Sequence, residues 1–117
     1  MGILEERLIN FATMILKLVE HLPRTLSAHR IGDQLARCST SVGANYEEAS
    51  AAESKQDFVH KIQIALKESR ESCYWLKVIS KGCFLQPVLV EPALDEALQI
   101  RAMLSKAVST AKSRMTQ

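Results

Sequence analysis

The sequence predicts an all-α fold, an antiparallel up-down-up-down four-helix bundle, and three observations support this. In four separate segments, apolar residues recur at alternating steps of three and four, which places them on one face of a helix. Aromatic residues make up only 5% of the chain and there are few glycines and prolines, which disfavours a sheet protein. The connections between segments are short, so consecutive helices are expected to pack antiparallel.

The length and composition predict one domain over residues 1–117. A chain of 117 residues with 47% hydrophobic side chains is large enough to bury a core, and no composition shift marks a second domain.

The first helix is predicted over residues 3–22. Pro23 should end it, because proline disfavours helical geometry in the residue before it. The residues expected on its buried face are Leu4, Leu8, Phe11, Ile15, Leu18 and Leu22.

The second helix is predicted over residues 28–52, with Ser27 as its N-cap. Gly43 in its interior suggests close approach of a neighbouring helix. The expected buried face consists of Ile31, Leu35, Cys38, Val42, Asn45, Ala49 and Ala52.

The third helix is predicted over residues 55–81. Ser54 and Asp57 resemble a capping box at its start, and Gly82 suits a left-handed cap at its end. Its expected buried face consists of Phe58, Ile62, Ala65, Ser69, Ser72, Leu76 and Ile79.

The fourth helix is predicted over residues 92–113, after an apolar loop at residues 83–90. Pro92 would lie in its first turn, where a missing backbone donor does no harm. Its expected buried face is dominated by alanine: Ala93, Ala97, Ile100, Leu104, Ala107 and Ala111.

Asn45 interrupts the apolar face of the second helix, and a buried amide must be hydrogen-bonded. Arg37, Glu48, Lys67 and Glu71 are candidates for a partly buried polar cluster around it. We expect this structural polar core to fix helix alignment and not to perform chemistry.

The first helix has apolar residues beyond its main face, at Ile9, Ala12, Leu16 and Val19. Surplus apolar surface usually marks a subunit contact, so we expect a homo-oligomer. The alternative is a generous core in a monomer.

The third helix also has a basic stripe at helical spacing, which is the best sequence evidence for nucleic-acid binding. Cationic side chains on one face can meet successive phosphates, and an aromatic ring among them can stack on a base. The candidate binding residues are His60, Lys67, Arg70, Tyr74, Lys77 and Lys81, with Gln63 between them. The alternative is an ordinary solvated helix face.

No catalytic, metal or cofactor site is predicted. A ferritin-like metal site needs paired carboxylate and Glu-x-x-His motifs, whereas the chain has a single similar spacing, Asp57-x-x-His60. Nucleophile motifs and phosphate-binding glycine loops are also missing from the sequence. The protein is therefore expected not to be an enzyme.

The sequence also predicts a cytoplasmic protein without membrane contact. The N-terminal segment has acidic residues where a signal peptide needs basic ones, and no apolar window is long enough to span a bilayer. Cys38, Cys73 and Cys83 are odd in number and widely spaced, which indicates reduced thiols.

Several segments together resemble a family of four-helix bundles encoded in intervening sequences of bacterial large-subunit ribosomal RNA genes. The resemblance rests on the Leu22-Pro23 helix stop and on residues 34–37, 39–49, 54–58 and 64–76, and it covers essentially the whole chain. Many members have a glycine after the glutamate of the second helix. This chain lacks it, so the second helix is expected to continue toward Ala52 or Glu53.

The resemblance implies a ring-like homopentamer with a central channel and no known enzymatic activity. A related branch is the accessory variability protein of diversity-generating retroelements, which binds nucleic acid and a reverse transcriptase. We therefore expect a non-enzymatic scaffold that binds RNA, DNA or a nucleic-acid-processing protein. The alternative is a purely structural or protein-interaction oligomer.

Overall fold

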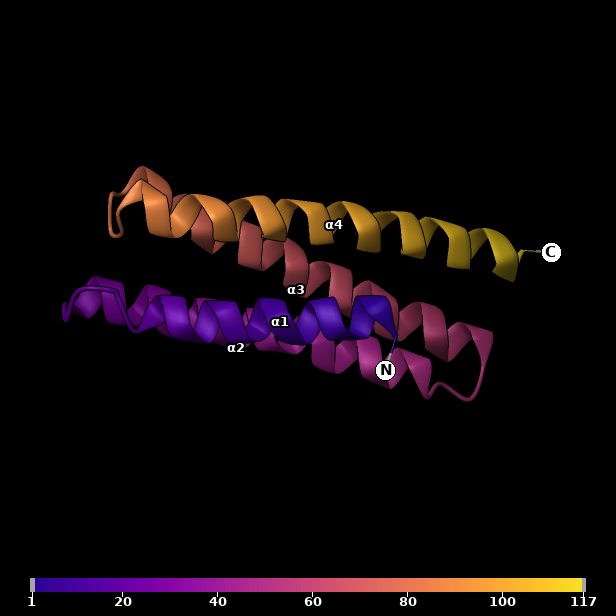
Figure 1. The fold of residues 1–117 in the computed structure, drawn as a ribbon. Helices are drawn as coiled ribbons and strands as arrows, with labels where there is room; N and C mark the ends of the chain where they lie inside the picture. The colour runs from indigo at the N-terminus through magenta and orange to yellow at the C-terminus, as the bar shows by residue number, and fades with distance from the viewer. Residues whose placement is uncertain (1, 117) are drawn as a thin grey trace.

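The computed structural model describes residues 2–116 and contains four helices (Figure 1). Their bounds are α1 Ile3–Val19, α2 Leu26–Ser50, α3 Lys55–Lys81 and α4 Pro87–Met115. No strand occurs in this described range. The predicted all-α, up-down-up-down four-helix bundle is confirmed.

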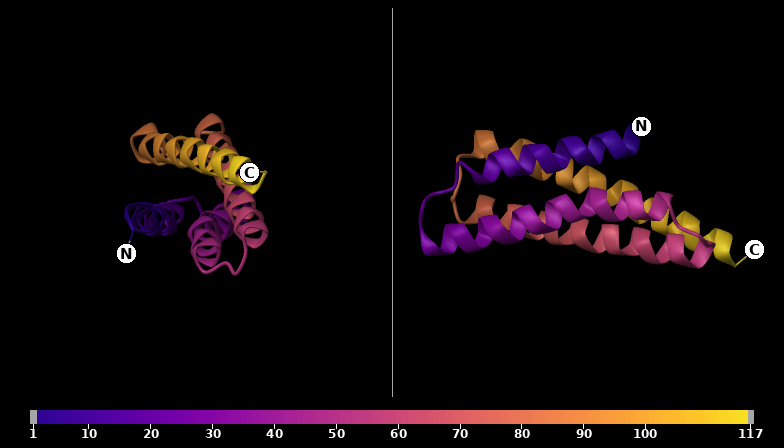
Figure 2. Two further views of the ribbon diagram at one scale, coloured as in Figure 1. Left: turned by 90° about the vertical axis from the view of Figure 1, so that its right-hand side faces the viewer. Right: turned by 90° about the horizontal axis from the view of Figure 1, so that it is seen from below.

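Each helix packs on its neighbours in the chain, and α1 also contacts α4. The end-on view in Figure 2 shows this order around the bundle axis. The molecule is elongated, with principal dimensions of 50 × 24 × 20 Å. Because α1 has 17 residues and α4 has 29, α1 covers only part of the bundle, and one end consists of α2, α3 and α4 alone.

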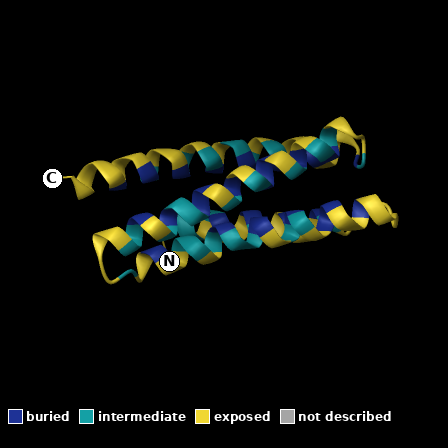
Figure 3. Ribbon diagram, turned by 180° about the vertical axis from the view of Figure 1, so that it is seen from behind, coloured by how far each residue is buried: buried dark blue, intermediate teal, exposed yellow. Residues whose placement is uncertain are grey.

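The core lies where the predicted apolar faces meet (Figure 3). All six residues expected to line α4 are buried except Ala107, which is half-buried. Of the residues expected on the buried face of the first helix, the four central ones are buried, and Leu4 within α1 and Leu22 beyond its end are half-buried. The hydrophobic pattern therefore identified the packing faces correctly, since burial of apolar surface is the main drive for helix association.

A polar clamp holds α1 against α4. The Arg7 guanidinium donates to both carboxylate oxygens of Glu96 at 2.8 and 2.7 Å, and also to the side-chain oxygen of Gln99 at 2.9 Å. The hydrogen bond to Glu96 raises the pKa of Arg7 above its ordinary value. A two-pronged contact of this kind fixes direction as well as distance, so it sets the position of α1 along α4.

Gly43 allows the close approach of α1 that the sequence indicates. A Cβ placed at this position would lie 3.4 Å from the Leu8 Cβ and 3.8 Å from the Leu8 backbone. A methyl group would make ordinary van der Waals contact there, so only a side chain larger than alanine would push α1 away from α2.

The connection between α1 and α2 differs from the prediction at both ends. α1 ends at Val19 and not at Leu22, because the last residues tighten into turn hydrogen bonds before Pro23. α2 begins at Leu26, and its N-cap is Thr25 rather than Ser27. The Thr25 hydroxyl accepts a hydrogen bond from the Ala28 amide at 3.2 Å.

Replacing Thr25 by alanine should lower the free energy of unfolding by about 1 kcal/mol, because the Ala28 amide loses its partner. Ser27→Ala provides the matched control, since Ser27 lies inside the first turn and is exposed. Urea denaturation followed by far-UV circular dichroism measures both. An equal loss in the two variants would contradict the assignment of the cap.

The connection between α2 and α3 confirms one expectation and corrects another. Ser54 caps α3 by accepting from the Asp57 amide at 3.0 Å, as predicted. α2 ends at Ser50 instead of continuing toward Ala52 or Glu53. Ala51 and Ala52 donate to carbonyls three residues back, and these turn bonds close the helix.

The end of α3 is built differently from the expected glycine cap. Gly82 has a helical backbone, and the left-handed conformation falls on Cys83, with a φ of 57°. Gly82 is instead required for space, because a Cβ there would lie 2.6 Å from the Phe84 ring. The half-buried Phe84 ring packs over the helix end and against the core.

α4 begins at Pro87, five residues before the predicted start, so the segment expected to be an apolar loop is partly helical. Pro87 is the first residue of the helix, a position that suits its fixed φ and its lack of a backbone N–H donor. Pro92 lies inside the helix and leaves only the carbonyl of Val88 without its helical donor. Val88 is 74% exposed in the first turn, where water can satisfy that carbonyl.

Candidate nucleic-acid interface

The basic stripe forms a continuous exposed surface along α3. Four lysine or arginine side chains and one histidine of the stripe are exposed to solvent: His60, Lys67, Arg70, Lys77 and Lys81. The Tyr74 ring lies among them with 58% of its surface exposed. The structure therefore brings the predicted binding residues together on one helix face.

Tyr74 is held beside a second aromatic ring. The Tyr74 and Trp75 centroids are 5.0 Å apart with an interplanar angle of 73°, an edge-to-face arrangement. Trp75 is half-buried and packs against the core. This contact orients Tyr74 while leaving most of its ring accessible.

The basic surface continues from α3 onto α4. A shallow notch of about 390 Å³ lies between the two helices, with Arg70 on one side and Lys112 on the other. Gln63, Ser105 and Ser109 add neutral polar groups to its lining. Cations with hydroxyl and amide donors are the groups that proteins use to contact phosphate oxygens. The α4 contribution was not found in the sequence, because Lys112 and the two serines show no separate pattern.

Two acidic residues of α3, Glu68 and Glu71, are engaged by α2, although Glu71 lies one helical turn from Lys67 of the stripe. The Arg37 guanidinium of α2 contacts Glu68 at 3.2 Å and also forms an ion pair with Glu71. The Trp75 indole donates to Glu71 at 3.3 Å. Among residues 2–116, the ion pairs involve Arg7 or Arg37, and no cation of the stripe takes part in one. The cations of the stripe are therefore unpaired in the described part of the subunit.

The polar residues expected to form one cluster around Asn45 do not all come together in the structure. Arg37 and Glu71 come together as described, but Glu48 and Lys67 are exposed and have no side-chain partner in the described part of the chain. Asn45 is half-buried, and its amide donates to the Ser41 carbonyl of the same helix at 2.9 Å. Within the described part of the subunit, the Asn45 amide thus donates within its own helix and forms no side-chain hydrogen bond to α3.

A different polar contact lies at that interface. The Ser39 hydroxyl of α2 donates to the Ser72 hydroxyl of α3 at 3.1 Å, and both side chains are fully buried. The Ser72 hydroxyl lies within hydrogen-bond distance of the Glu68 carbonyl oxygen of its own helix, at 3.0 Å, and donates to it. Ser72 was expected on the buried face, but its partner was missed because Ser39 lies one residue after Cys38 and so falls outside the predicted buried face of α2.

The cysteines are free thiols in this structure. Cys38 and Cys73 are buried, and burial raises the pKa of both. Cys83 is exposed at the end of α3. A buried neutral thiol behaves as a small apolar side chain, which agrees with the interpretation of Cys38 as part of the α2 seam.

Two further properties bear on function. Within the described chain, no group of three or more His, Cys, Asp or Glu side chains is placed to hold a metal ion, so Asp57 and His60 have no third partner. None of the described helices is both long enough and apolar enough to cross a membrane.

The fold and this surface define a small helical bundle with one positively charged helix face. A family model described as 23S rRNA-intervening sequence protein matches residues 4–106, and the chain belongs to this family. The resemblance noted from the sequence is thereby confirmed.

A solved structure with the same fold is a protein of unknown function from the S23 ribosomal protein family of Bacteroides thetaiotaomicron VPI-5482. It has 29% sequence identity and a TM-score of 0.83, and the match covers 91% of this chain and 98% of that chain. The comparison with curated proteins gave no match.

Proposed function

We propose that the protein is a non-enzymatic, homo-oligomeric scaffold that binds RNA or DNA along α3 and the adjoining face of α4. The observation that carries this proposal is the row of exposed, unpaired cations on α3. These cations have no ion-pair partners in residues 2–116, whereas the nearby carboxylates of Glu68 and Glu71 are already paired with Arg37 of α2.

The stripe has the dimensions of a nucleic-acid backbone contact. Lys67 and Lys81 are separated by 14 residues, which corresponds to about 21 Å along a helix. This length spans several phosphates, and each neutralised phosphate releases condensed counterions. Tyr74 in the middle of the stripe offers a stacking surface for an unpaired base.

The exposed flank of α1 supports self-association. Ile9 and Leu16 are 40% and 46% exposed, with the half-buried Ala12 and Val19 beside them. The family resemblance implies a pentameric ring, and the sequence features described above favour a cytoplasmic location. Repeating the stripe in each subunit would multiply the positive field several-fold, which compensates for the small net charge of +2 per chain.

The proposal is tested by fluorescence anisotropy with labelled 20-nucleotide single-stranded RNA and DNA. Because the stripe can contact about three phosphates per subunit, affinity should fall roughly 20-fold between 50 and 200 mM salt. Absence of association at low salt would contradict nucleic-acid binding. In that case a structural oligomer, or one that binds only protein partners, becomes the better account.

A further inference from the structure

We propose that the groove at the open end of the bundle binds a free amphipathic carboxylate, a small molecule with one carboxylate head and an apolar body. This groove has a volume of about 810 Å³ and lies between the α2–α3 turn, the first turns of α3 and the last turns of α4. It exists because α1 does not extend to this end of the molecule.

The floor of the groove is apolar. It is formed mainly by Phe58 and Val59 of α3 and by Ala107 and Ala111 of α4. The alanines on α4 leave room that larger side chains would fill, while Phe58 provides a half-buried aromatic surface. The volume is within the range of about 300–1,000 Å³ that is typical of small-molecule sites.

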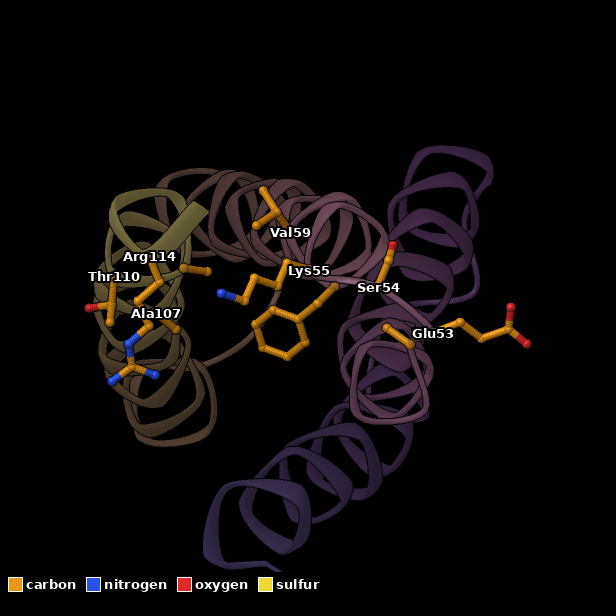
Figure 4. A pocket seen from close by; sticks show the side chains of 10 residues that line it. Glu53, Ser54, Lys55, Val59, Ala107, Thr110 and Arg114 are labelled. Carbon is orange, nitrogen blue, oxygen red and sulfur yellow. The ribbon is translucent and has the colours of Figure 1, made fainter. Parts of the chain in front are cut away.

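Two cations lie at the rim. Figure 4 shows Lys55 extending from the start of α3 toward α4, and Arg114 on the α4 side. The carboxylate of Glu53, although part of the lining, points away from the groove in the same view. Within residues 2–116, neither Lys55 nor Arg114 forms an ion pair.

This arrangement favours a carboxylate over other ligands. Lys55 and Arg114 supply charged hydrogen-bond donors for an anionic head, and the apolar floor accommodates an uncharged body. A nucleic-acid strand has a charge on every nucleotide and fits such a floor poorly. The residues that line the groove include none of the stripe residues, so this inference is independent of the proposed function.

Decanoate below its micellar concentration is a suitable probe for the full chain. We expect saturable binding at one site per chain, with amide chemical-shift changes confined to residues 52–59 and 107–114. Acetate has the head without the chain, and decyltrimethylammonium has the chain with the opposite charge. Neither should bind there.

Variants separate the charge contribution from the shape contribution. Lys55→Glu combined with Arg114→Glu should weaken decanoate binding at least tenfold, whereas the matched pair Lys17→Glu and Arg24→Glu, at the other end of the bundle, should leave it unchanged. Ala107→Phe should abolish binding by filling the groove. Far-UV circular dichroism checks that each variant is folded.

The inference would be overturned by non-saturable binding, by shift changes elsewhere in the molecule, or by equal binding of decanoate and decyltrimethylammonium. Binding that appears only when the oligomer is dissociated would also overturn it, because the groove would then be covered by a second copy of the chain.

Discussion

Replacing Phe11 by alanine should lower the free energy of unfolding by about 3–5 kcal/mol, because the truncated side chain leaves a cavity in the centre of the core. Phe11 is 1% exposed and lies in the buried cluster with Leu8 and Ile15. Domains of this size are stable by about 5–15 kcal/mol, so the change would remove a large part of the total. Urea denaturation monitored by circular dichroism measures it.

Phe58→Ala is the matched control for this experiment. Phe58 is only half-buried and borders the groove at the open end, so its truncation should cost less than half as much. Equal losses in the two variants would show that the α1 face does not form the centre of the core.

Introducing glutamate at both Ile9 and Leu16 should convert the proposed oligomer into a monomer. Both side chains are partly exposed on the α1 flank, so the charges would be tolerated in a free subunit but buried in a subunit interface. Unpaired charges in an interface cost several kcal/mol, which is enough to dissociate a moderate assembly. Light scattering at micromolar concentration, with circular dichroism as a folding check, provides the measurement.

The corresponding control places the same charges away from the flank. Leu26 and Val88 are 81% and 74% exposed, and glutamate at these two positions should leave the assembly intact. A wild-type protein that is already monomeric would contradict the oligomer, and dissociation by the control pair would contradict the location of the interface.

The sequence was sufficient to predict the helices and their buried faces because these depend on a repeated pattern. The seam of α3 illustrates this, since Ile62, Ala65 and Leu76 recur at helical spacing and all are buried. A pattern of this kind sums over many residues, so a single irregular position does not obscure it.

Helix boundaries were predicted less well, because they depend on single local contacts. α4 starts at Pro87 and not near Pro92, and either proline could occupy a first turn. Val90 is 1% exposed and stands three residues before Ala93, so the buried pattern itself extends to the observed start. Ser27 was predicted as the cap of α2, but Thr25 takes this role, because both residue types favour an N-cap and only the backbone geometry decides between them.

The polar contacts of the site could be predicted only in part. The stripe on α3 was recognisable because its residues share one helix and one face. The contact of Arg37 with Glu68 and Glu71 joins two helices, as does the Ser39–Ser72 contact, and each depends on the relative positions of those helices. Asn45 was expected to bridge helices, but the Ser41 carbonyl one turn earlier satisfies its amide at lower cost.

The central claim is that the position of positive charge on α3, and not the total charge of the protein, determines nucleic-acid binding. Fluorescence anisotropy with the 20-nucleotide RNA at 50 mM salt can test it by comparing two variants of equal net charge. We predict that Lys67→Glu with Lys77→Glu will weaken binding at least 30-fold, by roughly 1 kcal/mol or more for each reversed contact, whereas Lys17→Glu with Arg24→Glu will weaken it less than threefold. Equal weakening by the two pairs would contradict the account.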